Sequence, residues 1–198
     1  MTQIFTNEGL AIPVTVIRVK ACLITKIKEL EKDGYNAVQV GFLTTKVNRL
    51  TKSKLGFFKK HGLPICSNLS EFRIFRPENY NYIIGQKVSI EMFKIGEFIN
   101  ITGKSIGKGF SGNQKRHRFK RGPMTHGSKN HRAPGSIGPG TTPGRVFPGK
   151  RMSGQLGAKQ ITISRLEIIG RDVQQNLLII KGSVPGKPGN LLKISLSK

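Results

Sequence analysis

Hydrophobic and polar residues alternate in short runs along both ends of the chain, and this period of two predicts β-strands. Pro13–Val19 is mostly β-branched, with the proline at the first position, where a missing N–H is tolerated. Asp33-Gly34 is a turn signal before the alternating run Ala37–Phe42. Further strands are expected at Cys22–Ile27, Phe72–Phe75, Lys87–Met92, Phe98–Thr102, Gln160–Ser164, Leu166–Ile169, Leu177–Lys181 and Leu191–Leu196.

Helical periodicity is weak, and only Thr45–His61 is partly helical, with basic residues on most faces. Short strands with a turn signal about every 10 residues are typical of a small β-barrel or β-sandwich. Neither end of the chain has enough strands for a core of its own. We therefore expect a mainly β protein in which the two ends share one core.

The middle of the chain has a different composition. Gly103–Gly157 contains 13 glycines and 5 prolines, with few apolar residues and no period. A structureless loop of about 50 residues is unusual in a compact domain, so this one is either disordered or ordered by a partner. We expect residues 1–103 and 159–198 to form the β body, with a basic, partly helical insertion at about 44–70. Residues 104–158 form an extended loop, called the extension below.

Charge identifies the kind of partner. The chain has 198 residues with 34 Lys and Arg against 10 Asp and Glu, a formal net charge of +24. Residues 98–166 hold 14 of the Lys and Arg and no acid at all. Such a segment favours a polyanion, and its glycines permit close backbone approach, which fits nucleic acid. Met124, Phe147 and other apolar residues among the cations favour a defined path over the alternative, a flexible solvated tail.

The predicted contacts are the basic and histidine side chains of the extension. Neutralising roughly ten phosphates would make the affinity fall steeply with salt concentration. These residues are Lys104, Lys108, Lys115, Arg116, His117, Arg118, Lys120, Arg121, His126, Lys129, His131, Arg132, Arg145, Lys150 and Arg151.

Motifs for catalysis or cofactors are weak. Gly107–Gly112 matches GxGxxG, but no apolar helix follows and the next acid is Glu167, which argues against a dinucleotide site. Gly103-Lys104-Ser105 lacks the first glycine of a phosphate-binding loop. The extension has no carboxylate to orient a histidine or hold a cation. We expect no enzyme, no cofactor and no metal.

The two cysteines and the apolar runs add little. Cys22 and Cys66 are too few and too isolated for a disulfide framework or a zinc site. No apolar run approaches the ~20 residues of a membrane span. The segment Met1–Phe5 lacks the layout of a signal peptide. We expect no membrane partner and no homo-oligomer.

Long motifs in the extension resemble the family of large-subunit ribosomal protein 3. They are Phe119–Met124, His126–Arg132, Pro134–Ser136, Thr142–Phe147 and Gly149–Met152. Pro13–Ile17 is similar to the family's opening, and Leu177–Gly189 is similar to its close. The amino-acid sequence of Arg121–Met152 is most similar to that of cyanobacterial and plastid members of the family.

The resemblance implies a β-barrel body of the translation-protein type. It also implies a basic extension that enters the rRNA and nears the peptidyl-transferase centre. Members bind 23S-type rRNA directly near its 3′ end, support early subunit assembly and lie beside other large-subunit proteins. The expected location is the ribosome of a plastid (the chloroplast stroma), with the bacterial cytoplasm as the alternative.

Other functions stay open from the residues alone. A non-ribosomal RNA-binding protein or RNA chaperone on a similar barrel would also need a basic extension. A nucleotide-dependent RNA modifier would require the glycine motifs to bind ATP or NAD. A membrane-active cationic protein is disfavoured because the basic segment has no amphipathic period.

Overall fold

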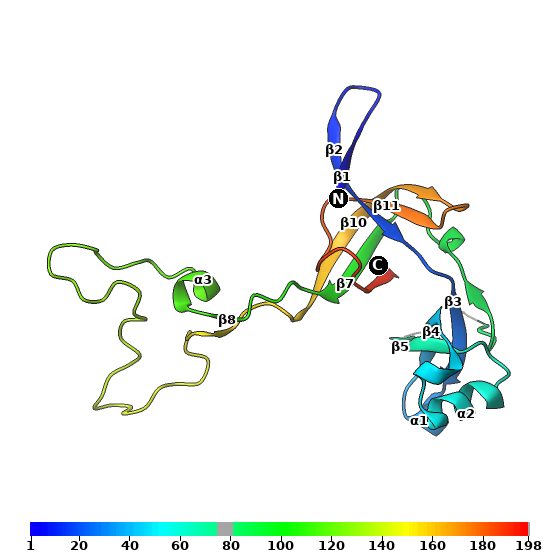
Figure 1. Cartoon of the computed structure of the whole chain (residues 1–198), viewed down its shortest axis with the longest axis horizontal. Coiled ribbons are helices and arrows are strands. Elements are labelled where there is room, and N and C mark those ends of the chain that lie inside the picture. The colour runs from blue at the N-terminus through cyan, green and yellow to red at the C-terminus, as the bar shows by residue number, and fades with distance from the viewer. Residues whose placement is uncertain (75–80, 198) are drawn as a thin grey trace. The chain divides into compact units, whose positions relative to one another are not determined.

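The computed structural model of the chain describes residues 1–74 and 81–197, and strands predominate in this part (Figure 1). The strands are β1 (Thr2–Phe5), β2 (Ala11–Arg18), β3 (Cys22–Lys28), β4 (Ala37–Thr44), β5 (Cys66–Arg73), β6 (Lys87–Val88), β7 (Phe98–Lys104), β8 (Phe110–Ser111), β9 (Gly154–Gln155), β10 (Gln160–Asp172), β11 (Leu177–Lys181) and β12 (Leu192–Leu196). The helices are α1 (Leu30–Asp33), α2 (Lys52–Lys60) and α3 (Asn113–His117), with 3-10 turns at Val47–Arg49 and Ile90–Met92.

The strands form three sheets. The largest has six strands in the order β1-β2-β11-β10-β7-β12, the second has four in the order β5-β4-β3-β6, and the third pairs β8 with β9. The mainly β class is therefore confirmed. In the described residues these strand orders are open at both ends, so the closed barrel stays a prediction.

The chain divides into two compact units. The first contains Met1–Ile99, Arg165–Ser183 and Leu196–Lys198. Within it, β11 pairs antiparallel with β2, from Leu177 opposite Arg18 to Lys181 opposite Val14. Strands from the two ends of the chain thus pair within one unit, while the expected single body of residues 1–103 and 159–198 stays a prediction.

The buried residues of the six-stranded sheet come from distant parts of the sequence. Val14, Ile168, Leu178 and Ile180 are all fully buried. The Thr15 hydroxyl donates a hydrogen bond of 2.6 Å to the carbonyl of Gly182. Burying an aliphatic side chain of this size contributes about 1.5–3 kcal/mol, so pairing between the ends of the chain contributes much of this unit's stability.

A second group of buried residues lies in the four-stranded sheet of the same unit. Ile24, Val38 and Val40 form its centre, at the strand positions that the alternation predicted. A side chain at Gly41 of β4 would lie 2.8 Å from the Thr25 methyl and 3.2 Å from Cys66 Cβ. The strand passes this point only because residue 41 has no Cβ.

Several expected elements differ from the observed ones. β5 begins at Cys66, well before the expected Phe72, because backbone pairing with β4 extends over its polar residues. Phe75, the last residue of that expected strand, lies outside the described residues. The expected strand Lys87–Met92 ends after Val88, since the Ser89 hydroxyl accepts a hydrogen bond from the Glu91 N–H and begins a 3-10 turn.

β10 is one strand of 13 residues where two were expected. Arg165 lies inside it with φ of 56°, a left-handed conformation that interrupts the alternation without ending the strand. α1 was not predicted, and α2 falls inside the expected helical segment Thr45–His61.

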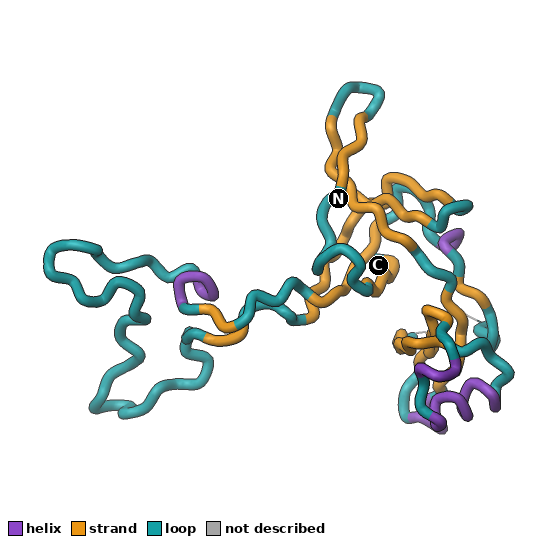
Figure 2. Tube along the Cα trace, viewed as in Figure 1, coloured by secondary structure: helices purple, strands orange, loops and turns teal. Residues whose placement is uncertain are grey.

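The second unit contains Asn100–Ser164 and Val184–Ser195, and the extension belongs to it. Figure 2 shows that β8, α3 and β9 are the extension's only regular elements among the described residues, and that loop connects α3 to β9. None of the helices described is long and apolar enough to cross a membrane. The division into a body and an rRNA-penetrating extension stays a prediction.

Candidate nucleic-acid interface

The two arms of the extension are held together where they leave the strands. The Ser105 N–H donates to the Lys159 carbonyl at 2.9 Å, and the Lys159 N–H donates to the Ser105 hydroxyl at 3.2 Å. Further along, the Lys108 N–H donates to Leu156 O at 2.8 Å, and the Leu156 N–H donates to Gly109 O at 3.0 Å. We call these paired arms, residues 105–111 and 154–159, the stem.

The stem is narrow because two glycines face each other across it. Gly157 has φ of +72°, and a Cβ there would overlap the carbonyl oxygen of Ile106. A Cβ on Gly107 would instead make an ordinary contact of 3.5 Å with Ala158 Cβ. The backbone geometry therefore requires a glycine at position 157 but not at position 107.

Beyond the stem, α3 presents basic residues at its C-terminal end. Lys115, Arg116 and His117 occupy the last turn, where positive charge interacts favourably with the helix dipole. Arg118 ends the helix in the left-handed conformation, with φ of 59°. Asn113 at the start of α3 is buried.

Two of these side chains hold the returning arm of the extension. Arg116 Nη1 donates to the Met152 carbonyl at 2.6 Å, and His117 Nε2 lies 2.9 Å from the same oxygen. Since a carbonyl only accepts, His117 Nε2 carries the proton. A Cβ on Gly154 would lie 2.8 Å from Arg116 Nη1, so the guanidinium also packs against the backbone there.

A second backbone contact closes the turn that carries His126 and Lys129. The Gly122 N–H donates to His131 O at 3.1 Å, and the His131 ring nitrogen Nδ1 lies 2.8 Å from Pro123 O. The backbones approach so closely that a Cβ on Gly122 would overlap the carbonyl of Asn130. His131 therefore stabilises the turn with one ring nitrogen.

The remaining cations of the extension point into solvent. None of them forms an ion pair with any residue that the structure describes. Unpaired cations spread along a backbone that is itself held in shape are suited to phosphates. The exposed residues are Lys104, Lys108, Lys115, Arg118, Lys120, Arg121, His126, Lys129, Arg132, Arg145, Lys150 and Arg151.

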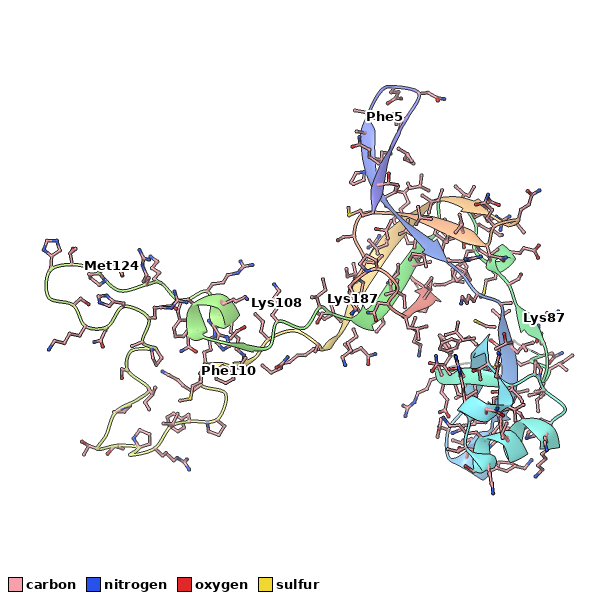
Figure 3. The ribbon with its side chains drawn as sticks, in the orientation of Figure 1. Phe5, Lys87, Lys108, Phe110, Met124 and Lys187 are labelled. Carbon is pink, nitrogen blue, oxygen red and sulfur yellow. The ribbon has the colours of Figure 1, made fainter. Side chains whose placement is uncertain are left out.

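Exposed apolar side chains lie among these cations. Phe110 is 78% exposed and Phe147 is 55% exposed, and the Arg145 guanidinium lies 5.6 Å from the Phe147 ring. Figure 3 shows Phe110 next to Lys108 at the stem and Met124 further out on the extension. Exposed aromatic rings beside cations are suited to stacking on unpaired bases.

The chain is similar in sequence to known proteins. Residues 78–172 match the family described as Ribosomal protein L3. The chain is 56% identical to the large ribosomal subunit protein uL3c of Phaeodactylum tricornutum, over 98% of this chain and 93% of that one. It is 53% identical to uL3 of Synechococcus sp. (strain JA-3-3Ab), over 100% of this chain and 92% of that one. It is 50% identical to uL3c of Gracilaria tenuistipitata var. liui, over 98% of this chain and 94% of that one.

The chain belongs to the ribosomal protein L3 family. The three relatives named above are plastid and cyanobacterial proteins, as the motifs of the extension predicted.

The predicted contact residues of this L3 family chain have two kinds of surroundings. Arg116, His117 and His131 are half-buried and bound to backbone carbonyls, while the others are exposed. The described residues hold no group of three or more His, Cys, Asp or Glu that could bind a metal. Phe110, which is strongly exposed beside these cations, is not among the contact residues predicted from the sequence. The sequence feature that points to Phe110 is an aromatic residue directly after a glycine, within a segment that has no acid.

Proposed function

We propose that this chain is a structural constituent of the large ribosomal subunit and that it binds 23S-type rRNA directly, near the 3′ end of that RNA. It supports early subunit assembly, and its extension reaches toward the peptidyl-transferase centre. It acts in the ribosome of a plastid, with the bacterial cytoplasm as the alternative location. It contacts neighbouring large-subunit proteins and carries out no catalysis.

One observation supports this proposal above all. The extension has a backbone held by its own hydrogen bonds, and its exposed cations have no acid in residues 98–166. The positive charges of such a surface repel one another. Phosphate groups of a nucleic acid supply the negative charge that neutralises them. Family membership supports the choice of rRNA over other nucleic acids.

The test uses the cations that have no structural contact in the described residues. Replacing Arg118, Lys120 and Arg121 together by Gln should weaken binding to 23S-type rRNA. Each lost phosphate contact lowers the slope of log K against log salt by about 0.9, so the slope should fall by about 2–3. Arg116 is left unchanged because it holds the Met152 carbonyl.

A matched control is the double variant Lys26→Gln and Lys32→Gln, because both lysines already pair with Asp33 and Glu29. It should bind the rRNA with the same slope as the unaltered protein. An unchanged slope in the extension variant would contradict the proposal. So would a protein that leaves the large subunit at moderate salt during gradient sedimentation, which would favour an RNA chaperone.

A further inference from the structure

The segment from Thr44 to Lys60, at the end of β4 and through α2, is a second region without acids. It contains Lys46, Arg49, Lys52, Lys54, Lys59 and Lys60, and all six side chains are exposed. No acid occurs between Asp33 and Glu71. The motifs of the extension do not include this segment.

The lysines of the neighbouring strands differ from those of α2 in their partners. Lys26 lies 2.9 Å from Asp33 Oδ1, and Lys28 lies 2.9 Å from Glu71 Oε1. No cation of residues 44–60 forms an ion pair with any residue that the structure describes. Within one compact unit, carboxylates thus pair with two lysines of β3, whereas the α2 segment keeps its positive charge.

Three of the four lysines of α2 lie on one side of the helix, and Lys54 lies on another side. Phe58 is buried at 1% exposure and therefore marks the inner face of the helix. Lys52, Gly56, Lys59 and Lys60 follow the i, i+4, i+7, i+8 spacing of a single helical face, roughly opposite Phe58. A Cβ on Gly56 would meet no atom within 4 Å, so a partner's backbone has open access between the lysines.

A shallow, open depression lies just before the helix. It has a volume of about 350 Å³ and is lined by Thr44, Thr45, Lys46 and Arg49. Hydroxyl, ammonium and guanidinium groups together donate hydrogen bonds to phosphate oxygens. A depression with these four side chains therefore fits an anionic group.

We propose that residues 44–60 form a second RNA-binding surface, separate in sequence from the extension, that contacts the phosphate backbone of paired RNA. Val47 is the only large apolar side chain of this segment that is strongly exposed among the described residues, and no exposed aromatic ring is available for stacking. The surface therefore contacts backbone rather than bases, which suits a duplex, whereas the extension has exposed Phe110 and Phe147 for unpaired bases. This inference rests on the proposed function, since it assumes that the physiological partner is RNA.

The test measures binding of the full-length protein to two probes, an RNA duplex without unpaired residues and an unpaired RNA of equal length. The variant Lys52→Gln, Lys59→Gln and Lys60→Gln should bind the duplex at least tenfold more weakly. Its salt slope on the duplex should fall by about 2–3, while binding to unpaired RNA changes less than threefold. The extension variant Arg118→Gln, Lys120→Gln and Arg121→Gln should show the larger loss on unpaired RNA.

A charge-retaining variant separates lost contacts from lost structure. Lys52→Arg, Lys59→Arg and Lys60→Arg keeps the positive charge and should retain duplex binding within threefold. Equal loss in the Arg and Gln variants would overturn the inference. So would duplex binding by the Gln variant that equals that of the unaltered protein, or a loss confined to binding of polyglutamate, an acidic peptide probe.

The two proposals fail in different ways. If the α2 inference is wrong, the α2 variant binds the duplex as tightly as the unaltered protein does. The extension variant still binds 23S-type rRNA more weakly. If the proposed function is wrong, the extension variant binds that rRNA with an unchanged salt slope, whatever the α2 variant does.

Discussion

Replacing Gly157 by Ala should open the stem without unfolding the rest of the protein. The residue has φ of +72°, which costs a non-glycine residue about 1–2 kcal/mol. The new Cβ would also overlap the carbonyl oxygen of Ile106, so the two arms have to separate. The Lys108–Leu156 and Leu156–Gly109 hydrogen bonds then weaken, at about 1 kcal/mol each.

The expected loss of local stability is therefore about 2–4 kcal/mol. Amide hydrogen exchange of the Lys108 and Leu156 N–H groups measures it directly, and both should exchange at least tenfold faster in the variant. The amides of β2 and β11 should keep their exchange rates, because they lie in the other compact unit.

Gly107→Ala is the matched control, on the opposite arm of the same stem. Its Cβ would make only a 3.5 Å contact with Ala158, so the exchange rates of the stem amides should stay within about twofold. Unchanged protection of Lys108 and Leu156 in Gly157→Ala would refute the steric argument. Equal loss in both variants would show that the stem is sensitive to any added side chain.

Two further perturbations probe charge and stacking. The Lys28 ammonium and the Tyr35 hydroxyl hold the pKa of Glu71 below its ordinary value of 4.5, so this carboxylate stabilises the fold above that pH and its contribution is lost as the pH falls through the lowered pKa. Thermal melts should thus show Glu71→Gln less stable than the unaltered protein at pH 7, and this deficit should shrink as the pH falls below 4.5. Glu31→Gln, at an exposed residue, should leave the melting temperature at pH 7 unchanged. A Glu71→Gln deficit that stays the same at every pH would contradict the pairing. Replacing Phe110 and Phe147 by Ala should weaken rRNA binding by about 1–3 kcal/mol per stacked base with an unchanged salt slope, and a changed slope without loss of affinity would exclude stacking.

Strands with β-branched, alternating residues were predictable from sequence. β2, β4 and β11 have this pattern, and each lies within a few residues of its expected position. β5 was mostly missed because its first residues, Cys66–Glu71, are largely polar. They form a strand because β4 provides a backbone partner, and sequence alone does not reveal that pairing.

The same limit applies to the candidate site. Its positive charge was predictable from composition, since an acid-free segment is visible in the sequence. The contacts of Arg116 and His117 with Met152 were not, because more than 30 residues separate them along the chain. α3 was missed for a related reason, since its five polar residues have no apolar face and depend on that distant carbonyl.

The pairing of β2 with β11 has a consequence for synthesis of the chain on the ribosome. β2 cannot pair with β11 until almost the whole chain has emerged, whereas β3, β4, β5 and β6 are complete by Val88. Domains generally fold from the N-terminus as they are made, and long-range strand pairing is slow. During translation, the four-stranded sheet therefore forms first, and the β1–β2 pair stays without β11 until later. The basic extension emerges from the exit tunnel before β2 pairs with β11, so it is accessible to RNA while the nascent chain is still incomplete.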